Sequence, residues 1–258
     1  MMKDNVVAHL IYDDKKWKRN TLFKLICKKS FRRRFFRSDF FFQHMMQLSP
    51  IPRKKLQEIA LPHQIVLEDF FSRNGNVSPY ELMAICALIV HFKPQRLLEI
   101  GTFDGNTSLQ MALNISDTAM IHTLDLPPGQ TMSGQPILNS DLKFIEDEEK
   151  NSRKFMKHSR RSQVKQHFGD STLFDFSIFI KEGLLDFIFV DGGHSYGCVK
   201  SDTENALKVL SEEGMIVWHD FTPHFGDVFK FLCELSRHLP LVHIEETNLV
   251  FYKKEIKR

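Results

Sequence analysis

From residue 96 to the C-terminal end, short apolar segments alternate with segments of helical pattern, and this alternation constrains the fold more than any other feature. A helix between two buried strands carries the chain back to the same edge of the sheet, so successive strands run parallel. Parallel sheets of this kind are covered by helices on both faces. The pattern predicts an α/β fold with a doubly wound sheet. The expected strands cover residues 96–100, 120–125, 164–168, 186–191, 215–219, 241–245 and 249–253.

Helices are expected between these strands and ahead of them. Ser78 followed by Pro79 is typical of a helix start, because Ser is a frequent N-cap and Pro fits the first helical position. The expected helices cover residues 53–93, 107–114, 200–210 and 228–237. We divide the chain into a basic aromatic arm at residues 1–50, a helical region at 51–95 and an α/β domain at 96–258.

One connection is longer than a βαβ unit needs. About 37 residues separate Asp125 from Gln163; they begin with Pro127, Pro128 and Gly129 and then become highly charged. Connections of this length are usually functional or mobile. We interpret residues 126–162 as a helix plus a lid over a ligand site, and a mobile surface loop is the alternative.

The N-terminal arm has a strongly biased charge. Residues 15–37 contain eleven Lys and Arg and no acid; the whole chain has a net charge of +3, so the rest carries −8. Arg and Phe interleave at residues 31–37, and three Phe follow at 40–42. Such a segment can pack on the domain or stay solvated, contact an anionic membrane through residues 15–42, or bind nucleic acid. No specific nucleic-acid motif is present, so we expect no specific nucleic acid partner.

Composition favours a globular cytoplasmic protein. The hydrophobic share is 42% and the charged share 26%, which suits a chain with a full core. No apolar run approaches the length that spans a bilayer, and the N-terminus lacks the pattern of a secretory signal. The four cysteines lie far apart without a Cys-x-x-Cys pair, so we expect reduced, mostly buried thiols.

The loop after the first strand has glycines at Gly101 and Gly105, a G-x-x-x-G spacing. The dinucleotide fingerprint G-x-G-x-x-G would place its second glycine at Phe103 and its third at Asn106. Phe103 argues against a pyrophosphate, whereas the turn into a helix still offers backbone N–H groups to a polar ligand. Glu99 adds negative charge at the strand end, which suits a cationic ligand. S-adenosylmethionine carries an ammonium and a sulfonium and no phosphate.

Acids follow or end three successive strands. Asp125 ends the second expected strand, and its carboxylate can accept hydrogen bonds from both hydroxyls of a ribose. Asp170 follows the third strand and can accept a hydrogen bond from an adenine amino group. Each acid alone is typical of a loop or cap, but Glu99, Asp125 and Asp170 together favour an adenosine-containing ligand.

Residues 98–108, LEIGTFDGNTS, resemble the first motif of class I S-adenosylmethionine-dependent methyltransferases. More narrowly, the chain resembles a subgroup with DGGHSY, at residues 191–196, and WHD, at 218–220. The similarity covers about residues 80–253 and includes 124–128 (LDLPP), 169–171 (GDS) and 202–207 (DTENAL). Residues 1–75 lie outside it.

The resemblance implies a Rossmann-like sheet of seven strands, mostly parallel with the last antiparallel, preceded by an N-terminal helical extension. It implies an S-adenosylmethionine-dependent methyltransferase whose cofactor contacts the three acids and the glycine loop. The expected cofactor-binding residues are Glu99, Gly101, Thr102, Phe103, Gly105, Ser108, Asp125, Asp170, Ser171 and Asp191.

Asp191 and Asp220 end adjacent strands, so their carboxylates are expected close together, with His194 and His219 nearby. This combination suits a divalent metal site or general-base catalysis. Related O-methyltransferases for catechol-like and sugar hydroxyls bind Mg²⁺ through acids at these strand ends, which implies Asp191 and Asp220 as ligands. Those enzymes usually place a second acid or amide beside the later ligand, whereas this chain has His219 there, which leaves room for a softer metal. The alternative is that His219 or Asp220 only orders the loop.

The expected reaction is an in-line displacement at the sulfonium methyl group, with alignment and exclusion of water supplied by the protein. His194 can take the proton of a hydroxyl acceptor, and a metal at Asp191 can make that hydroxyl more acidic. A structural histidine in the turn is the alternative for His194. The acceptor is expected to be a small hydroxylated metabolite, a sugar or a lipid-linked molecule, and a homodimer is left open.

Three other functions remain open from the sequence. The same cofactor can serve metal-independent methylation at nitrogen or carbon. A non-catalytic protein can keep the cofactor fold and be recruited through its basic arm. An NAD-dependent oxidoreductase is the weakest alternative, because of Phe103.

Overall fold

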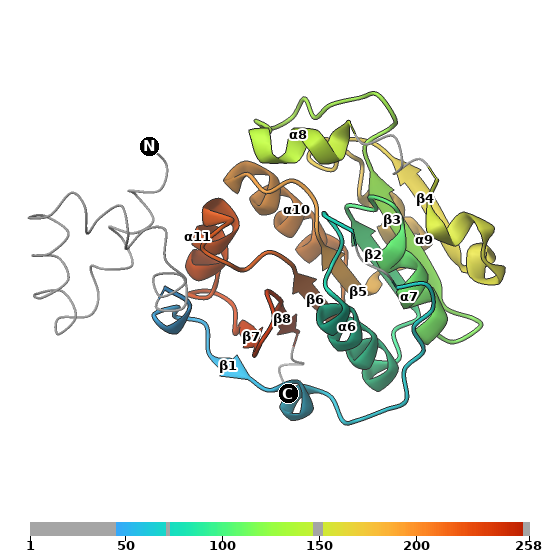
Figure 1. Cartoon of the computed structure of the whole chain (residues 1–258), viewed down its shortest axis with the longest axis horizontal. Coiled ribbons are helices and arrows are strands. Elements are labelled where there is room, and N and C mark those ends of the chain that lie inside the picture. Colours follow the sequence, from blue (N-terminus) through green and yellow to red (C-terminus); the bar gives the residue numbers. More distant parts are fainter. Residues whose placement is uncertain (1–44, 71–72, 147–151, 255–258) are drawn as a thin grey trace, which may run out of the picture.

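The computed structural model describes residues 45–70, 73–146 and 152–254. Residues 1–44 of the basic arm, which include 15–42, lie outside the described residues, so the membrane or partner contacts of this segment stay predictions. Within the described residues eight strands form one sheet, in the order β1-β7-β8-β6-β5-β2-β3-β4 (Figure 1). The strands are β1 Arg53–Lys54, β2 Arg96–Ile100, β3 Met120–Asp125, β4 Val164–Phe168, β5 Leu185–Val190, β6 Leu210–Trp218, β7 Val242–Ile244 and β8 Val250–Lys253.

Strands β2 to β6 are mutually parallel, whereas β8 runs antiparallel to both β6 and β7. The chain proceeds outward from β2 to β4 on one side and from β5 to β6 on the other, so the strand order reverses between β2 and β5. Ligands in open α/β sheets bind beyond the carboxyl ends of the strands at such a reversal. The topology therefore confirms the expected Rossmann-like fold and shows where a ligand site belongs.

Helices cover both faces of this sheet (Figure 1). One apolar core packs α6 and α7 on the sheet, and a second packs α9, α10 and α11 on the opposite face. The helices are α5 Leu56–Ile59, α6 Pro79–Phe92, α7 Asn106–Asn114, α8 Asn139–Ile145, α9 Ser177–Glu182, α10 Tyr196–Val209 and α11 Gly226–Leu235. Two 3-10 turns, η2 Lys154–Lys157 and η3 Ser159–Gln163, precede β4. None of the described helices is long and apolar enough to cross a membrane.

Two predictions for the N-terminal region need correction. The sheet has eight strands rather than seven, because the exposed pair Arg53–Lys54 adds to its edge beside β7. Only backbone pairing marks this strand, so no apolar pattern could show it. In the described part of 53–93, which leaves out residues 71–72, only α5 and α6 are helical. Between them, the side chains of Asn114 and Gln110 on α7 bond the backbone of an extended loop at Val66 and Glu68.

The predicted start of α6 is confirmed. Ser78 Oγ accepts a hydrogen bond from the Glu81 backbone N–H, and the Glu81 carboxylate accepts one from the Ser78 N–H. This reciprocal capping box satisfies two backbone donors that a helix start would leave unpaired. It also holds the Glu81 side chain at the top of the helix, where it meets His219.

Candidate active site

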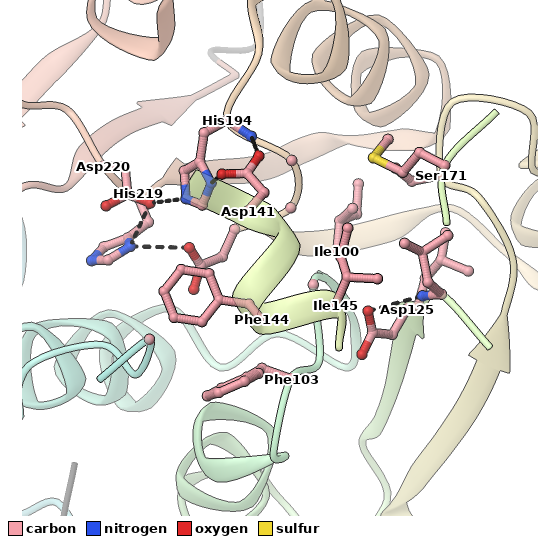
Figure 2. Close-up of a pocket in the computed structure, with 18 of the residues that line it drawn as sticks. Ile100, Phe103, Asp125, Asp141, Phe144, Ile145, Ser171, His194, His219 and Asp220 are labelled. Atoms are coloured by element: carbon pink, nitrogen blue, oxygen red, sulfur yellow. Dashed lines mark hydrogen bonds and ion pairs between the residues drawn. The ribbon is translucent and has the colours of Figure 1, made fainter. Parts of the chain in front are cut away.

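A cavity of about 320 Å³ lies beyond the carboxyl ends of β2 to β6, at the reversal of strand order. Residues that end or follow these strands line it, and the loop around Gly75 closes one side. Helix α8, from the long 126–162 connection, contributes Asp141, Phe144 and Ile145 (Figure 2). The predicted helix within that connection is present and lines the cavity, and the lid stays a prediction. Among the described residues that line the cavity there is no Lys or Arg.

Gly101 is the tightest point of the loop that follows β2. Its φ is +97°, and a Cβ there would lie 2.0 Å from the Asp191 carbonyl oxygen. The ends of β2 and β5 are held together here, because the Asp191 N–H donates to the Ile100 carbonyl at 2.8 Å. Only glycine fits this left-handed, crowded position. Gly101 and Phe103 both line the cavity, and their contact with a cofactor stays a prediction.

Five of the predicted cofactor residues do not line the cavity: Glu99, Thr102, Gly105, Ser108 and Asp170. Glu99 is fully buried and accepts hydrogen bonds from the hydroxyls of Ser108 and Thr123. Burial raises the pKa of Glu99 to about 8, against the effect of these bonds. The expected negative charge facing a cationic ligand is therefore corrected: Glu99 is mostly protonated at neutral pH and holds β2, β3 and α7 together.

This burial predicts a pH effect on stability. Between the ordinary pKa of a glutamate and about 8, the folded protein holds a proton on Glu99 that the unfolded chain has lost, so the unfolding free energy falls as pH rises through that window. The glutamine of Glu99→Gln does not titrate. The unfolding free energy of this variant should therefore fall less steeply with pH than that of wild type, by up to about 1.4 kcal/mol per pH unit. Denaturant unfolding at several pH values measures the difference. The exposed Glu213→Gln is the control, and parallel profiles for wild type and Glu99→Gln would refute the assignment.

Asp125 lines the cavity, and a buried arginine that the sequence pattern did not show holds it from behind. Arg153 donates two hydrogen bonds of 3.2 Å to Asp125 Oδ2 and a third of 3.0 Å to the Phe103 carbonyl. The other oxygen, Oδ1, accepts from the Leu126 N–H at 2.9 Å. Arg153 therefore fixes the orientation of the carboxylate that was predicted to bind ribose, and it ties that carboxylate to the glycine loop.

We expect Arg153→Gln to weaken S-adenosylhomocysteine binding about tenfold or more, because it loosens both Asp125 and the Phe103 carbonyl. Calorimetric titration measures the affinity. Arg161→Gln, an exposed arginine in η3, is the matched control and should bind as wild type does. Equal affinities for the two variants would show that Arg153 does not position the cofactor end of the cavity.

Asp170 does not line the cavity, whereas its neighbour Ser171 does. Its carboxylate accepts from the backbone N–H groups of Ser133 and Gly134, and from both the N–H and the hydroxyl of Thr172. Partial burial acts to raise the pKa of Asp170, but these hydrogen bonds outweigh it and lower the pKa. The predicted contact with adenine therefore gains no support. Asp170 instead attaches the 126–162 connection to the end of β4.

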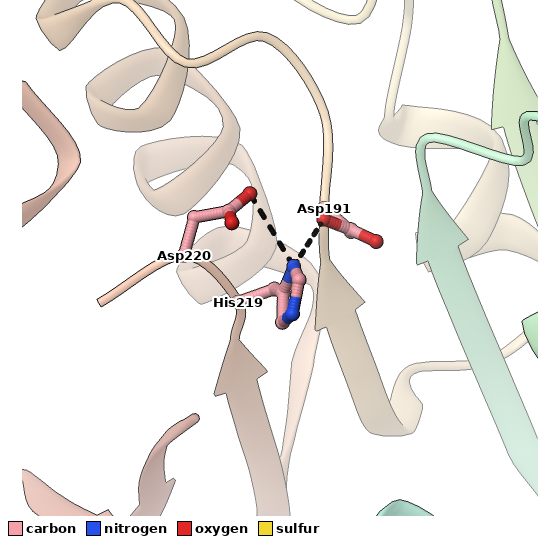
Figure 3. Close-up of side chains that lie close together, drawn as sticks. All are labelled: Asp191, His219 and Asp220. Carbon is pink, nitrogen blue, oxygen red and sulfur yellow. Dashed lines mark hydrogen bonds and ion pairs between the residues drawn. The ribbon is translucent and has the colours of Figure 1, made fainter. Parts of the chain in front are cut away.

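Asp191, His219 and Asp220 come together as predicted, at the ends of β5 and β6 (Figure 3). His219 Nδ1 lies 3.0 Å from Asp191 Oδ1 and 3.3 Å from Asp220 Oδ2. One ligand atom from each residue falls within 4.8 Å of the other two. Burial disfavours a charged His219, but the two carboxylates raise its pKa well above the ordinary value.

Glu81 reaches the same cluster from α6. Its Oε2 lies 3.4 Å from His219 Nε2, the ring nitrogen that faces away from the two aspartates. Burial acts to raise the pKa of Glu81, but the hydrogen bonds and charge of His219 outweigh it and lower the pKa to about 2. A carboxylate on the far nitrogen of an imidazole is the usual second partner of a metal-binding histidine, since it fixes the tautomer.

His194 lies between two carboxylates. Its Nδ1 is 2.9 Å from Asp141 Oδ1 and its Nε2 is 2.6 Å from Asp220 Oδ2. Burial acts to lower the pKa of His194, but the two carboxylates outweigh it and raise the pKa to about 10. A group that keeps its proton at neutral pH cannot accept another, so this arrangement does not favour the predicted general-base role. His194 bridges the carboxylates of Asp141 and Asp220.

Sequence reasoning missed Glu81, Asp141 and Arg153, each of which contacts a predicted site residue. Glu81 was visible only as part of a helix start, and Asp141 and Arg153 fall in the charged 126–162 connection. The sequence offered one signal for Asp141 and Arg153. The connection that contains them is too long for a βαβ unit, and connections of that length are usually functional or mobile. We call Glu81, Asp141, Asp191, His194, His219 and Asp220 the strand-end cluster.

Comparison with known proteins gives one family match and several solved structures of similar fold. Residues 98–221 match the model of a family described as "Methyltransferase domain". The S-adenosylhomocysteine-bound methyltransferase PaMTH1 of Podospora anserina is 20% identical over 70% of this chain and 80% of that chain, with a TM-score of 0.51. A putative caffeoyl-CoA O-methyltransferase of Staphylococcus aureus is 18% identical over 70% and 85%, with a TM-score of 0.51.

The O-methyltransferase TomG of Streptomyces achromogenes, solved with S-adenosylmethionine, is 16% identical over 85% of this chain and 99% of that chain, with a TM-score of 0.50. No match was found among curated protein sequences. At these identities the solved structures establish the fold, and the family match places a methyltransferase domain at residues 98–221. These two findings together indicate a methyltransferase built on a Rossmann-like fold.

Proposed function

We propose that the protein transfers the methyl group of S-adenosylmethionine to a hydroxyl oxygen of a small acceptor. The observation that carries this proposal is the strand-end cluster, which puts Asp191, His219 and Asp220 at the reversal point of the sheet, in the same cavity as the glycine loop. Two of the solved structures of similar fold are described as O-methyltransferases, one of them putative, which is consistent with the proposal.

The cavity suits the cofactor. At Gly101 the loop leaves no room for a side chain, and Asp125 presents a carboxylate that is fixed by Arg153. The described lining has carboxylates and no Lys or Arg, so it favours a cationic ligand over one with phosphates. We assign the ribose to Asp125, the amino acid end to the loop at Gly101, and the reacting methyl group to the side of Asp191.

The strand-end cluster also suits a divalent cation. Asp191, Asp220 and His219 Nδ1 form a donor set of two carboxylates and one imidazole, and Glu81 supports the imidazole from its other nitrogen. Such a mixed set favours a transition metal such as Mn²⁺ over Mg²⁺, which prefers oxygen ligands. A bound cation would make a coordinated acceptor hydroxyl more acidic. Asp191, His219 and Asp220 would hold the cation, and His194 would hold Asp220.

Acceptor size and polarity follow from the walls of the cavity. Phe103, Phe144 and Phe225 provide apolar surfaces, and the strand-end cluster provides a polar end. A flat or ring-shaped acceptor with a hydroxyl at one end fits this division, because aromatic walls bury its body while polar groups orient the reacting oxygen. Phenols, vicinal diols and sugars are the acceptors that we propose.

Two experiments test the function. Calorimetric titration should show tight binding of S-adenosylmethionine and S-adenosylhomocysteine and none of NAD; a chain that binds neither of the first two lacks the proposed activity. Labelled methyl donor, offered with panels of phenols, diols, sugars and amines, should then give a product methylated at oxygen. A product methylated only at nitrogen or carbon, or activity unaffected by chelator, would remove the hydroxyl or the metal from the proposal.

A further inference from the structure

Helix α8 contributes a carboxylate to the strand-end cluster from a part of the chain that no sequence motif covers. Asp141 is 6% exposed and accepts two hydrogen bonds from one residue: His194 Nδ1 donates to Oδ1 at 2.9 Å, and the His194 backbone N–H donates to Oδ2 at 3.1 Å. Two bonds to a ring and its own backbone fix both the position and the rotation of the His194 side chain. Figure 2 shows Asp141 on α8 pointing to this ring.

His194, held in this way, contacts Asp220. Its other nitrogen, Nε2, lies 2.6 Å from Asp220 Oδ2, and its ring stacks on Phe225 with centroids 4.4 Å apart. Phe225 holds one face of the ring, and the two carboxylates hold its edges. The Asp220 oxygen that meets His194 is the same Oδ2 that lies 3.3 Å from His219 Nδ1. Asp141 is thus connected, through one imidazole, to an oxygen of the proposed metal and acceptor site.

A second contact fixes α8 across the cavity. Phe144, one turn after Asp141, meets the Phe103 ring edge-on with centroids 5.7 Å apart. A Cβ on Gly75 would lie 2.6 Å from the Phe144 ring, so the glycine leaves space for it. Because Asp141 and Phe144 lie on one helix, the bond to His194 forms when α8 lies across the cavity.

We propose that Asp141 is a positioning residue for methyl transfer, which holds His194 so that His194 in turn fixes Asp220 Oδ2 in the strand-end cluster. The inference rests on the proposed function, because it gives Asp220 a part in the reaction. It adds that the site is complete only with α8 in place, so the 126–162 connection supplies part of the machinery as well as covering the cavity.

The test compares Asp141→Ala and Asp141→Asn with wild type by NMR of protein labelled with ¹⁵N-histidine and bound to S-adenosylhomocysteine. In wild type both ring N–H groups of His194 are held by buried carboxylates and should exchange slowly with water. In Asp141→Ala both should exchange about tenfold faster or more, Nδ1–H directly and Nε2–H because the ring is no longer oriented. Asp141→Asn keeps one acceptor oxygen and should fall between. His194→Gln identifies the signals by their loss.

Glu146→Ala is the matched control, because Glu146 is an exposed acid at the end of the same helix. It should keep the wild-type signals. With catechol as probe acceptor, Asp141→Ala should lower kcat about tenfold or more and leave the KM for S-adenosylmethionine within about threefold. An unchanged Nε2–H signal in Asp141→Ala, or a raised KM with intact kcat, would overturn the proposal. Wild type that methylates no acceptor would refute the proposed function, while the Nε2–H comparison would still decide whether Asp141 positions Asp220.

Discussion

Gly101→Ala should abolish measurable binding of S-adenosylmethionine and S-adenosylhomocysteine, which means a loss of about 100-fold or more. The new methyl group would lie 2.0 Å from the Asp191 carbonyl oxygen, and the backbone would hold an alanine at φ +97°. The left-handed conformation costs an L-residue about 1–2 kcal/mol, and overpacking typically adds 1–3 kcal/mol. The backbone segments at Gly101 and Asp191 cannot simply move apart. The Gly101 N–H donates to the Leu124 carbonyl and the Asp191 N–H to the Ile100 carbonyl, each at 2.8 Å.

Gly129→Ala separates the two causes. Gly129 has a φ of +72°, but a Cβ there would meet nothing within 4 Å. It carries the backbone strain without the collision, so its affinity should stay within about threefold of wild type. Thermal unfolding of both variants shows whether Gly101→Ala remains folded. A folded Gly101→Ala that binds S-adenosylhomocysteine within tenfold of wild type would show that the close approach at Asp191 does not shape the cofactor site.

The features that sequence could predict are those that depend on regular spacing. The apolar strands of the parallel sheet were placed closely, and β3 and β4 begin and end where the pattern placed them. Once parallel strands are known, their carboxyl ends must meet at one edge, so Asp125, Asp191 and Asp220 could be brought together without coordinates. That reasoning needs only the order of the elements.

Which side of the sheet a strand-end residue faces is a finer question. Successive side chains of a strand point to opposite faces, and Ile100 lines the cavity, so Glu99 faces α7 on the other side. The sequence placed Glu99 at the correct strand end, but the strand register that decides between ligand and core was not visible. Glu99 is therefore a buried, mostly protonated structural group, whereas the sequence predicted a charged contact to the ligand.

The contacts from irregular segments were beyond sequence reasoning for a different reason. Arg153 and Asp141 belong to a connection without a repeating pattern, and each makes specific pairings with residues far along the chain. Such pairs depend on where the connection lies in space, which no local spacing determines. His194 shows the consequence: without Asp141 in view it looked like a free base, whereas two carboxylates raise its pKa to about 10.

Asp220→Asn should lower kcat about 100-fold or more and remove any response to Mn²⁺. Asp220 has a φ of +59°, a left-handed conformation that Asn also adopts readily, so the backbone should be preserved. The variant removes the negative charge whose oxygen lies between His194 Nε2 at 2.6 Å and His219 Nδ1 at 3.3 Å. His194 keeps Asp141, and His219 keeps Asp191 and Glu81, so each imidazole retains a partner and the protein should remain folded.

The control is Asp69→Asn, because Asp69 is an exposed aspartate that also has a positive φ, of +44°. Asp69→Asn makes the same substitution at a positive φ away from the site. Both variants should unfold near the wild-type temperature. Methyl transfer from labelled donor is then followed with chelator and with Mn²⁺ added back. An Asp220→Asn enzyme with kcat within threefold of wild type and an intact Mn²⁺ response would mean that the reacting oxygen is activated elsewhere, and that the strand-end cluster only orders the end of β6.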